Sequence, residues 1–210
     1  MTLGEIKIES LKLMYTNLAD DINEDMLENY LNDENYRGYL FAMTGSINRC
    51  FGRIENRKVL PSKSYTLDAS MGEKRGAFIR FNLDYLIKDI YCVDRIVYEN
   101  TNGAYVPDYD YMTEGNYLVL NSIKDGETYT VIYKPTIKRV GSGNDEKEID
   151  IPDSIATIIP YYVKGDLFRD DEPNEASESR NWFEQALDEI AYKPTSKSNT
   201  VKSVFNQTEW

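Results

Sequence analysis

Apolar residues recur at helical spacing near both ends of this chain, whereas the middle alternates with a period of two. The longest helical stripe repeats every three or four residues and comprises Tyr36, Leu40, Met43, Ile47, Cys50 and Ile54. This spacing places the residues on one face and predicts a helix over about Asn35–Lys58. Arg53, Arg57 and Lys58 suit the negative end of its dipole.

Two further helices are predicted before the long one. Thr2 and Glu5 have the spacing of a capping box, and the apolar residues that follow favour a helix over about Leu3–Leu18. A short helix over about Asn23–Asn32 follows an acidic stretch. The carboxylates there suit a helix N-terminus better than a ligand site.

Two late helices are predicted from proline positions and apolar faces. The first begins near Pro152, and Pro160 should kink it, because a proline inside a helix removes a hydrogen bond. Pro173 opens the second, which continues to about Ile190. These helices are short, so they need the apolar seam of the long helix to bury their own apolar faces.

The region from Leu60 to Val140 favours short antiparallel strands separated by glycine turns such as Asn102-Gly103. One helical turn is expected at Leu83–Lys88. The expected strands are Ala77–Phe81, Tyr91–Glu99, Ala104–Val106, Tyr109–Thr113, Tyr117–Leu120 and Glu127–Lys134. So many short strands suggest a small sandwich or an open barrel.

The order of these elements predicts an α+β fold. Three early and two late helices form one helical bundle, with an antiparallel β-sandwich-like or barrel-like region inserted at one end and an extended C-terminal arm. The predicted units are the first bundle part at 1–59, the β-region at 60–140, the linker and second bundle part at 141–191, and the arm at 192–210.

Three glycines, Gly38, Gly45 and Gly52, recur every seven residues on the long helix, opposite its apolar seam. Each costs about 1 kcal/mol against alanine inside a helix. Their repetition favours close packing of a second backbone there, from this subunit or from a neighbour. The alternative is chance, tolerated because packing on the seam is strong.

Composition argues against an enzyme. The chain has 210 residues, two cysteines, no histidine and a formal charge of −12. Mechanisms that pair serine or cysteine with histidine cannot operate within it, and neither a metal site nor a cofactor motif is recognisable. Both Cys50 and Cys92 have apolar neighbours and are expected to be buried thiols. The acidity makes an outer DNA-gripping patch unfavourable.

The last eighteen residues differ from the rest of the chain because they carry three lysines and a single acid, Glu209. A frayed terminus is the simpler interpretation. The alternative is a docking arm that adds a strand to a partner or inserts side chains into its pockets. The candidate docking residues are Lys197, Val201, Lys202, Val204, Phe205 and Trp210.

Two passages and the overall plan resemble the head-to-tail connector, or adaptor, proteins of tailed bacteriophages. SINRCFGRIENRK at Ser46–Lys58 is similar to their long early helix. IPYYVKGDLFRDDEPNEASESRNWFEQALDEI at Ile159–Ile190 looks like their paired late helices. The β-region of about eighty residues is longer than in the smallest members and more similar in plan to that of larger adaptors.

The resemblance implies a non-enzymatic structural protein of the virion neck, made in the host bacterial cytoplasm. It implies a ring of commonly twelve copies beneath the portal protein, which extends the DNA channel and docks the tail. The arm would bind the portal, and the β-region would contact the next neck or tail component, such as a stopper, tail terminator or tail tube. Genomic DNA would pass the acidic walls of the lumen without sequence-specific binding.

Two other interpretations remain open. A tail completion protein would form a ring of another order, commonly six copies. A carbohydrate- or host-binding virion module would instead use exposed tyrosines of the β-region, especially Tyr105, Tyr109 and Tyr111.

Overall fold

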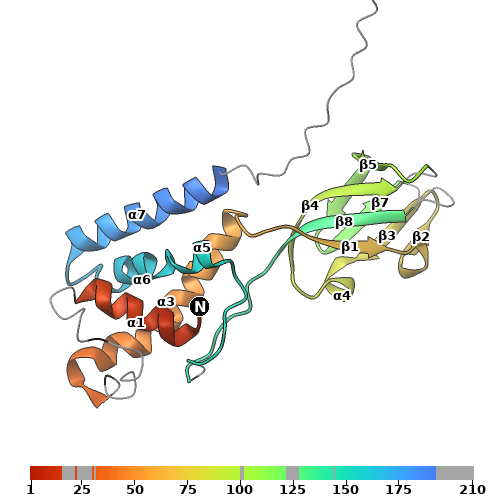
Figure 1. Cartoon of the computed structure of the whole chain (residues 1–210). Helices are drawn as coiled ribbons and strands as arrows, with labels where there is room; N and C mark the ends of the chain where they lie inside the picture. The colour runs from red at the N-terminus through yellow and green to blue at the C-terminus, as the bar shows by residue number, and fades with distance from the viewer. Residues whose placement is uncertain are drawn as a thin grey trace, which may run out of the picture.

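Two hydrophobic cores organise the structure, one in a helical bundle and one in a β-sandwich beside its end (Figure 1). The structure is a computed structural model that describes residues 1–15, 22, 30, 32–99, 102–121, 128–143 and 145–192. The bundle core combines residues from both ends of the chain, and the sandwich core uses only residues between Leu67 and Tyr133. The fold is therefore α+β, as the sequence predicts.

The helices of the bundle pack around α6, which contacts α1, α3 and α7. They are α1 (Leu3–Met14), α3 (Glu34–Asn56), α5 (Asp153–Ala156), α6 (Ile159–Leu167) and α7 (Pro173–Tyr192). The predicted seam of α3 is buried from Leu40 to Ile54. The predicted short helix over Asn23–Asn32 lies largely outside the described residues.

Two helix predictions need correction. The first helix ends at Met14 rather than Leu18, where the ring of Tyr15 packs edge-on against Tyr36. The late helix predicted from Pro152 is not kinked but divided into α5 and α6. Pro160 lies in the first turn of α6, where its missing N–H costs no hydrogen bond.

Two four-stranded antiparallel sheets form the sandwich, which confirms the sandwich-like prediction; the described strands close no barrel. The first sheet has the order β1-β8-β4-β5 and comprises β1 (Lys63–Leu67), β8 (Thr128–Pro135), β4 (Ile90–Glu99) and β5 (Tyr105–Asp108). The second has the order β2-β3-β7-β6 and comprises β2 (Glu73–Arg75), β3 (Phe78–Asn82), β7 (Tyr117–Leu120) and β6 (Tyr111–Glu114). The predicted helical turn is α4 (Leu83–Leu86).

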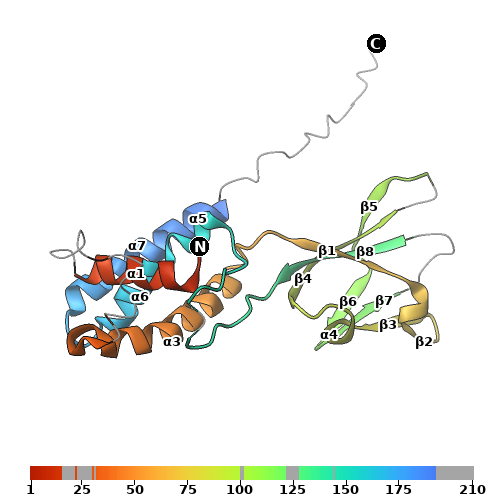
Figure 2. The ribbon, with the colours of Figure 1, turned by 60° about the horizontal axis from the view of Figure 1, so that its bottom comes forward.

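The bundle and the sandwich meet at the C-terminal end of α3, where the chain leaves the bundle and later returns (Figure 2). The Tyr91 hydroxyl donates to Asn56 Oδ1 at 2.6 Å. Lys134 Nζ donates to the Leu60 carbonyl oxygen at 2.9 Å. These two hydrogen bonds join the segment that follows α3 to β4 and β8, so the bundle and the sandwich are connected at this junction.

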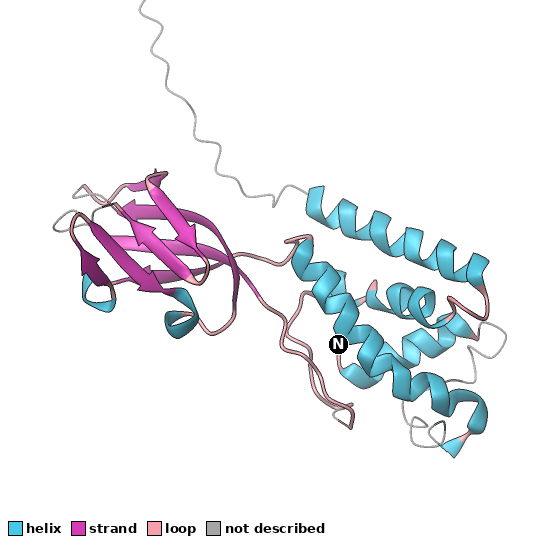
Figure 3. Cartoon of the chain, turned by 180° about the vertical axis from the view of Figure 1, so that it is seen from behind, coloured by secondary structure: helices cyan, strands magenta, loops and turns pink. Residues whose placement is uncertain are grey.

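The returning chain, residues 137–151, runs back along the bundle as a strap (Figure 3). Buried Glu55 on α3 accepts from the Ile137 amide at 2.7 Å and from Arg139 Nη2 at 2.6 Å. Asn48 exchanges two hydrogen bonds with the backbone of Val140. At its far end Lys7 Nζ lies 2.6 Å from Asp145 Oδ1. The strap therefore ties the insertion to both α3 and α1.

Candidate functional site

The glycine face of α3, defined by Gly38, Gly45 and Gly52, contacts no second backbone within the described chain. A Cβ at Gly38 would meet nothing within 4 Å, and one at Gly45 would meet only Arg49 Nη1 at 3.5 Å. At Gly52 the nearest atom belongs to the side chain of Arg139. Between the first two glycines, Phe41 is 60% exposed. Close packing against a second backbone is therefore absent among the described residues, and packing against a neighbouring subunit stays a prediction, as does the alternative of chance.

The close backbone approach occurs elsewhere, at Gly165 on α6. A Cβ there would lie 2.8 Å from the Ala176 carbonyl oxygen and 3.1 Å from the Arg180 amide nitrogen. Both atoms belong to the backbone of α7. The sequence pattern gave no signal for this crossing because Gly165 is a lone glycine in a short helix.

Salt bridges across α3, α6 and α7 hold the outer side of the bundle. Arg53 Nε and Nη2 contact the two oxygens of Glu184 at 2.7 and 2.8 Å. This contact, with help from Arg57, lowers the pKa of Glu184 although its partial burial opposes the shift. Bidentate pairing of this kind fixes the relative position of two helices.

The second ionic cluster centres on Asp166 of α6, which pairs with Arg49 of α3 and with Arg180 of α7. Burial raises the pKa of Asp166, but the hydrogen bond from Arg49 and the nearby guanidinium charges outweigh it and hold that pKa below its ordinary value. These groups serve helix packing, because the single carboxylate on α6 joins guanidinium groups from both α3 and α7.

The described residues assemble no group that could bind a metal ion, and their cysteines differ in burial. No group of three cysteine, aspartate or glutamate side chains in the described part of the chain could hold a metal ion. Burial raises the pKa of the Cys50 thiol well above its ordinary value, so the nucleophilic thiolate is disfavoured. Cys92 is only half-buried, which corrects the prediction of two buried thiols.

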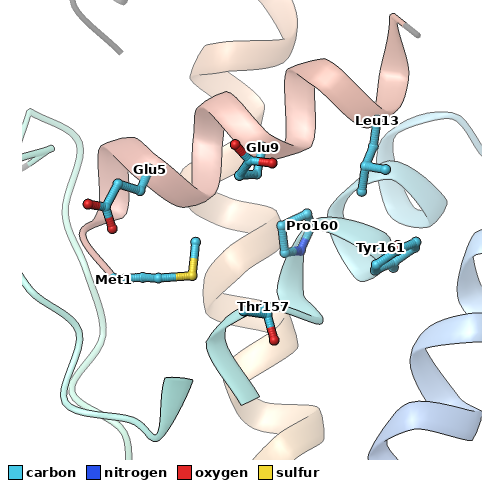
Figure 4. Close-up of a pocket in the computed structure, with 7 residues that line it drawn as sticks. All are labelled: Met1, Glu5, Glu9, Leu13, Thr157, Pro160 and Tyr161. Carbon is cyan, nitrogen blue, oxygen red and sulfur yellow. The ribbon is translucent and has the colours of Figure 1, made fainter. Parts of the chain in front are cut away.

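A groove of about 340 Å³ lies between α1 and α6 (Figure 4). Its lining residues are Met1, Glu5, Glu9, Leu13, Thr157, Pro160 and Tyr161. Ligand sites usually have about 300–1,000 Å³, so the groove has room for a few side chains. Sequence periodicity could not reveal it, because its walls come from segments about 150 residues apart.

An aromatic ridge formed by Tyr161 and Trp182 borders this groove on the α7 side. The two rings stack with centroids 6.5 Å apart and an interplanar angle of 27°. Trp182 is 59% exposed. A large exposed ring beside an apolar groove is typical of a protein-binding surface.

The tyrosines named as carbohydrate-binding candidates lie on the sandwich. Tyr105 and Tyr109 are 69% and 87% exposed, whereas Tyr111 is half-buried against the sandwich core. The structure therefore exposes two of the three rings.

The candidate docking residues of the arm lie outside the part of the chain that the structure describes. They are Lys197, Val201, Lys202, Val204, Phe205 and Trp210. Their role stays a prediction. Among the described helices, none is long and apolar enough to cross a membrane.

No family model, curated protein or solved structure matches the chain. Its function is therefore inferred from the fold and its exposed surfaces.

Proposed function

We propose that this chain is a structural protein of the neck of a tailed-bacteriophage virion. It would form a ring of twelve copies beneath the portal protein, extend the DNA channel and dock the next neck or tail component. The observation that carries the proposal is the open glycine face of α3 on the bundle, together with a separate sandwich at the end of the bundle (Figure 1). The basic sequence that follows α7 is a third candidate contact, predicted from composition alone.

A ring subunit needs a lateral surface for its neighbours and axial surfaces for the components above and below. The glycine face of α3 supports the lateral contact, because Gly38 and Gly45 leave room for a second helix and exposed Phe41 offers it apolar area. The sandwich and the arm supply two separate axial contacts. The formal charge of −12 suits a channel that DNA passes without adhering.

The decisive experiment is cryo-electron microscopy of the purified protein mixed with virus-derived portal–neck complexes. The proposal predicts twelve copies beneath the portal, with the glycine face of α3 against the next copy. Absence of binding, or attachment only at the distal tail, would contradict it. A ring of six at the tail would favour a tail completion protein instead.

The lateral contact can be tested with Gly45→Leu in the same reconstitution. Because a Cβ at Gly45 would meet only the side chain of Arg49, the subunit should fold normally and fail to form the ring. Arg75→Leu, which places the same side chain on an exposed strand of the sandwich, is the matched control and should assemble. Normal assembly of the Gly45 variant would remove the glycine face from the proposal.

A second candidate function is sugar binding by the exposed rings of Tyr105 and Tyr109. Exposed aromatic rings suit this role because sugars stack on their apolar faces. A glycan-array signal that is lost in the variant with both tyrosines changed to alanine would favour this function over the neck role.

A further inference from the structure

The groove between α1 and α6 and its aromatic ridge form a continuous surface that combines apolar side chains with carboxylates. Three of its walls are apolar side chains of Leu13, Pro160 and Tyr161, and Trp182 extends the apolar area beyond the rim. Among its described lining residues, the charged side chains are Glu5 and Glu9. Met1 also lines the groove, and its N-terminal ammonium lies 3.6 Å from Asp153 Oδ1, which offsets that positive charge. Such a surface suits a segment that combines apolar side chains with positive charge.

The two carboxylates retain capacity for a basic ligand. Glu5 Oε2 accepts from the Thr2 amide at 2.8 Å, and Glu9 Oε1 accepts from Lys12 Nζ at 2.8 Å. The other oxygen of each carboxylate accepts no hydrogen bond from the described residues. A carboxylate offers about four acceptor positions, so each can accept from a lysine without losing its present partner.

One segment of this chain has the complementary chemistry. Residues 193–210 carry three lysines and one acid, in a protein that is otherwise acidic. Val201, Val204 and Phe205 have the i, i+3, i+4 spacing by which an amphipathic segment inserts apolar side chains into a groove. Lys197 precedes this apolar set, and Lys202 lies within it, between Val201 and Val204.

The described chain ends close to the groove. α7 contacts α5, and both ribbon views place α5 beside the C-terminal end of α7 (Figures 1 and 2). Thr157, which follows α5 directly, lines the groove. Eighteen residues can span roughly 60 Å when extended, about twice the length of α7, so the segment reaches the groove from Tyr192.

We propose that residues 193–210 dock intramolecularly in the groove between α1 and α6, with their apolar side chains against Tyr161 and Trp182 and their lysines beside Glu5 and Glu9. A short tether gives the segment an effective concentration on the order of millimolar at the groove. The groove is therefore occupied by the segment even when the affinity between them is weak. The contact does not require a ring. Its consequence, that the arm is withheld from the portal until a partner displaces it, rests on the proposed function.

The tryptophans provide a direct readout, because the chain has only two, Trp182 on the ridge and Trp210 in the segment. In the full chain carrying Trp210→Phe, Trp182 is the sole tryptophan, and acrylamide quenching measures its exposure. Adding V201S and F205S should increase the quenching constant about twofold, because undocking uncovers the ring. The matched control S203A/N206A, which alters polar residues of the same segment, should leave it unchanged.

A second variant tests the charge contribution. Glu9→Lys in the Trp210→Phe chain should raise the quenching constant of Trp182, whereas Glu73→Lys makes the same charge change on the distant sandwich and should not. Far-UV circular dichroism verifies that each variant is folded. Equal quenching in the parent, V201S/F205S and Glu9→Lys chains would overturn the proposal.

A dilution series distinguishes a segment that docks within its own chain from one that is donated by a second copy of the chain. Intramolecular docking predicts a quenching constant that does not change on hundredfold dilution. Protection of Trp182 that disappears on dilution would assign the segment to a second copy and overturn the intramolecular proposal. Because no portal is present, neither result depends on whether the neck assignment is correct.

Discussion

Gly165 allows α6 and α7 to cross at backbone distance, since its missing Cβ would lie 2.8 Å from a carbonyl oxygen of α7. The Arg180 side chain lies closer still, but two of the three nearest atoms are backbone, so a rotamer change of Arg180 alone cannot relieve the overlap. We therefore expect Gly165→Ala to lower the free energy of unfolding by about 1–3 kcal/mol, measured by urea denaturation.

The control is Gly38→Ala on α3, where a Cβ would meet nothing within 4 Å. This substitution should raise the free energy of unfolding of the monomer by about 0.5–1 kcal/mol, because alanine loses less conformational freedom than glycine in a helix. If both variants changed stability equally, helix propensity alone would explain them and the close crossing would be refuted.

At the scale of elements, the ionic contacts that join α3 to α7 should make stability depend on acid. The pKa of Glu184 is lowered in the folded protein by Arg53. The unfolded chain therefore binds more protons as the pH falls. The stabilisation is complete above the ordinary glutamate pKa of about 4 and is lost as pH falls through the lowered folded value.

We expect Glu184→Gln to reduce the urea midpoint at neutral pH and to have a progressively smaller effect as the pH is lowered below about 4. Glu73→Gln is a suitable control, because Glu73 pairs with its near neighbour Arg75 on the exposed surface and joins no two helices. A constant difference between wild type and Glu184→Gln across that range would show that the carboxylate charge is not what stabilises the helix pair.

Strong periodicity made several elements predictable. The seam of α3 and the Val- and Tyr-rich β4 and β8 were found within a few residues. β1 and β2 were missed because β2 has no buried residue and β1 buries only Leu67. Their pairing with β8 and β3 depends on backbone hydrogen bonds, which leave little trace in the side-chain pattern.

The candidate site was less predictable for a different reason. The groove joins α1 to α6, and the ridge joins α6 to α7, so both depend on which helices become neighbours. Sequence spacing predicted close packing at the glycines of α3, but in the structure the close backbone approach is at Gly165, and Gly38 has no atom within 4 Å of its missing Cβ.

At the scale of the whole molecule, the sandwich is an insertion into a bundle that has its own core. Leu60 and Ile137, on either side of the insertion, both belong to the bundle core. We expect replacement of residues 61–136 by a short glycine–serine linker to leave a cooperatively folding bundle, since loop length affects stability only weakly.

This shortened chain should keep its helical circular dichroism and a single thermal transition. Binding of the dye ANS would report an exposed, loosely packed core. A dye-binding, non-cooperative product would mean that the bundle needs the junction contacts of Tyr91 and Lys134 in order to pack.

The strap also constrains the order in which the chain folds during synthesis. The backbone amides of Leu3 and Gly4 donate to the carbonyls of Lys147 and Asp145, and α6 covers the same helix. At about 5–20 residues per second, the ribosome needs roughly ten to thirty seconds to supply these partners. The residues of the sandwich are synthesised before α6, so the apolar face of α1 remains uncovered during this time. Chaperones that act on nascent chains can therefore bind the first helix for longer than any later one.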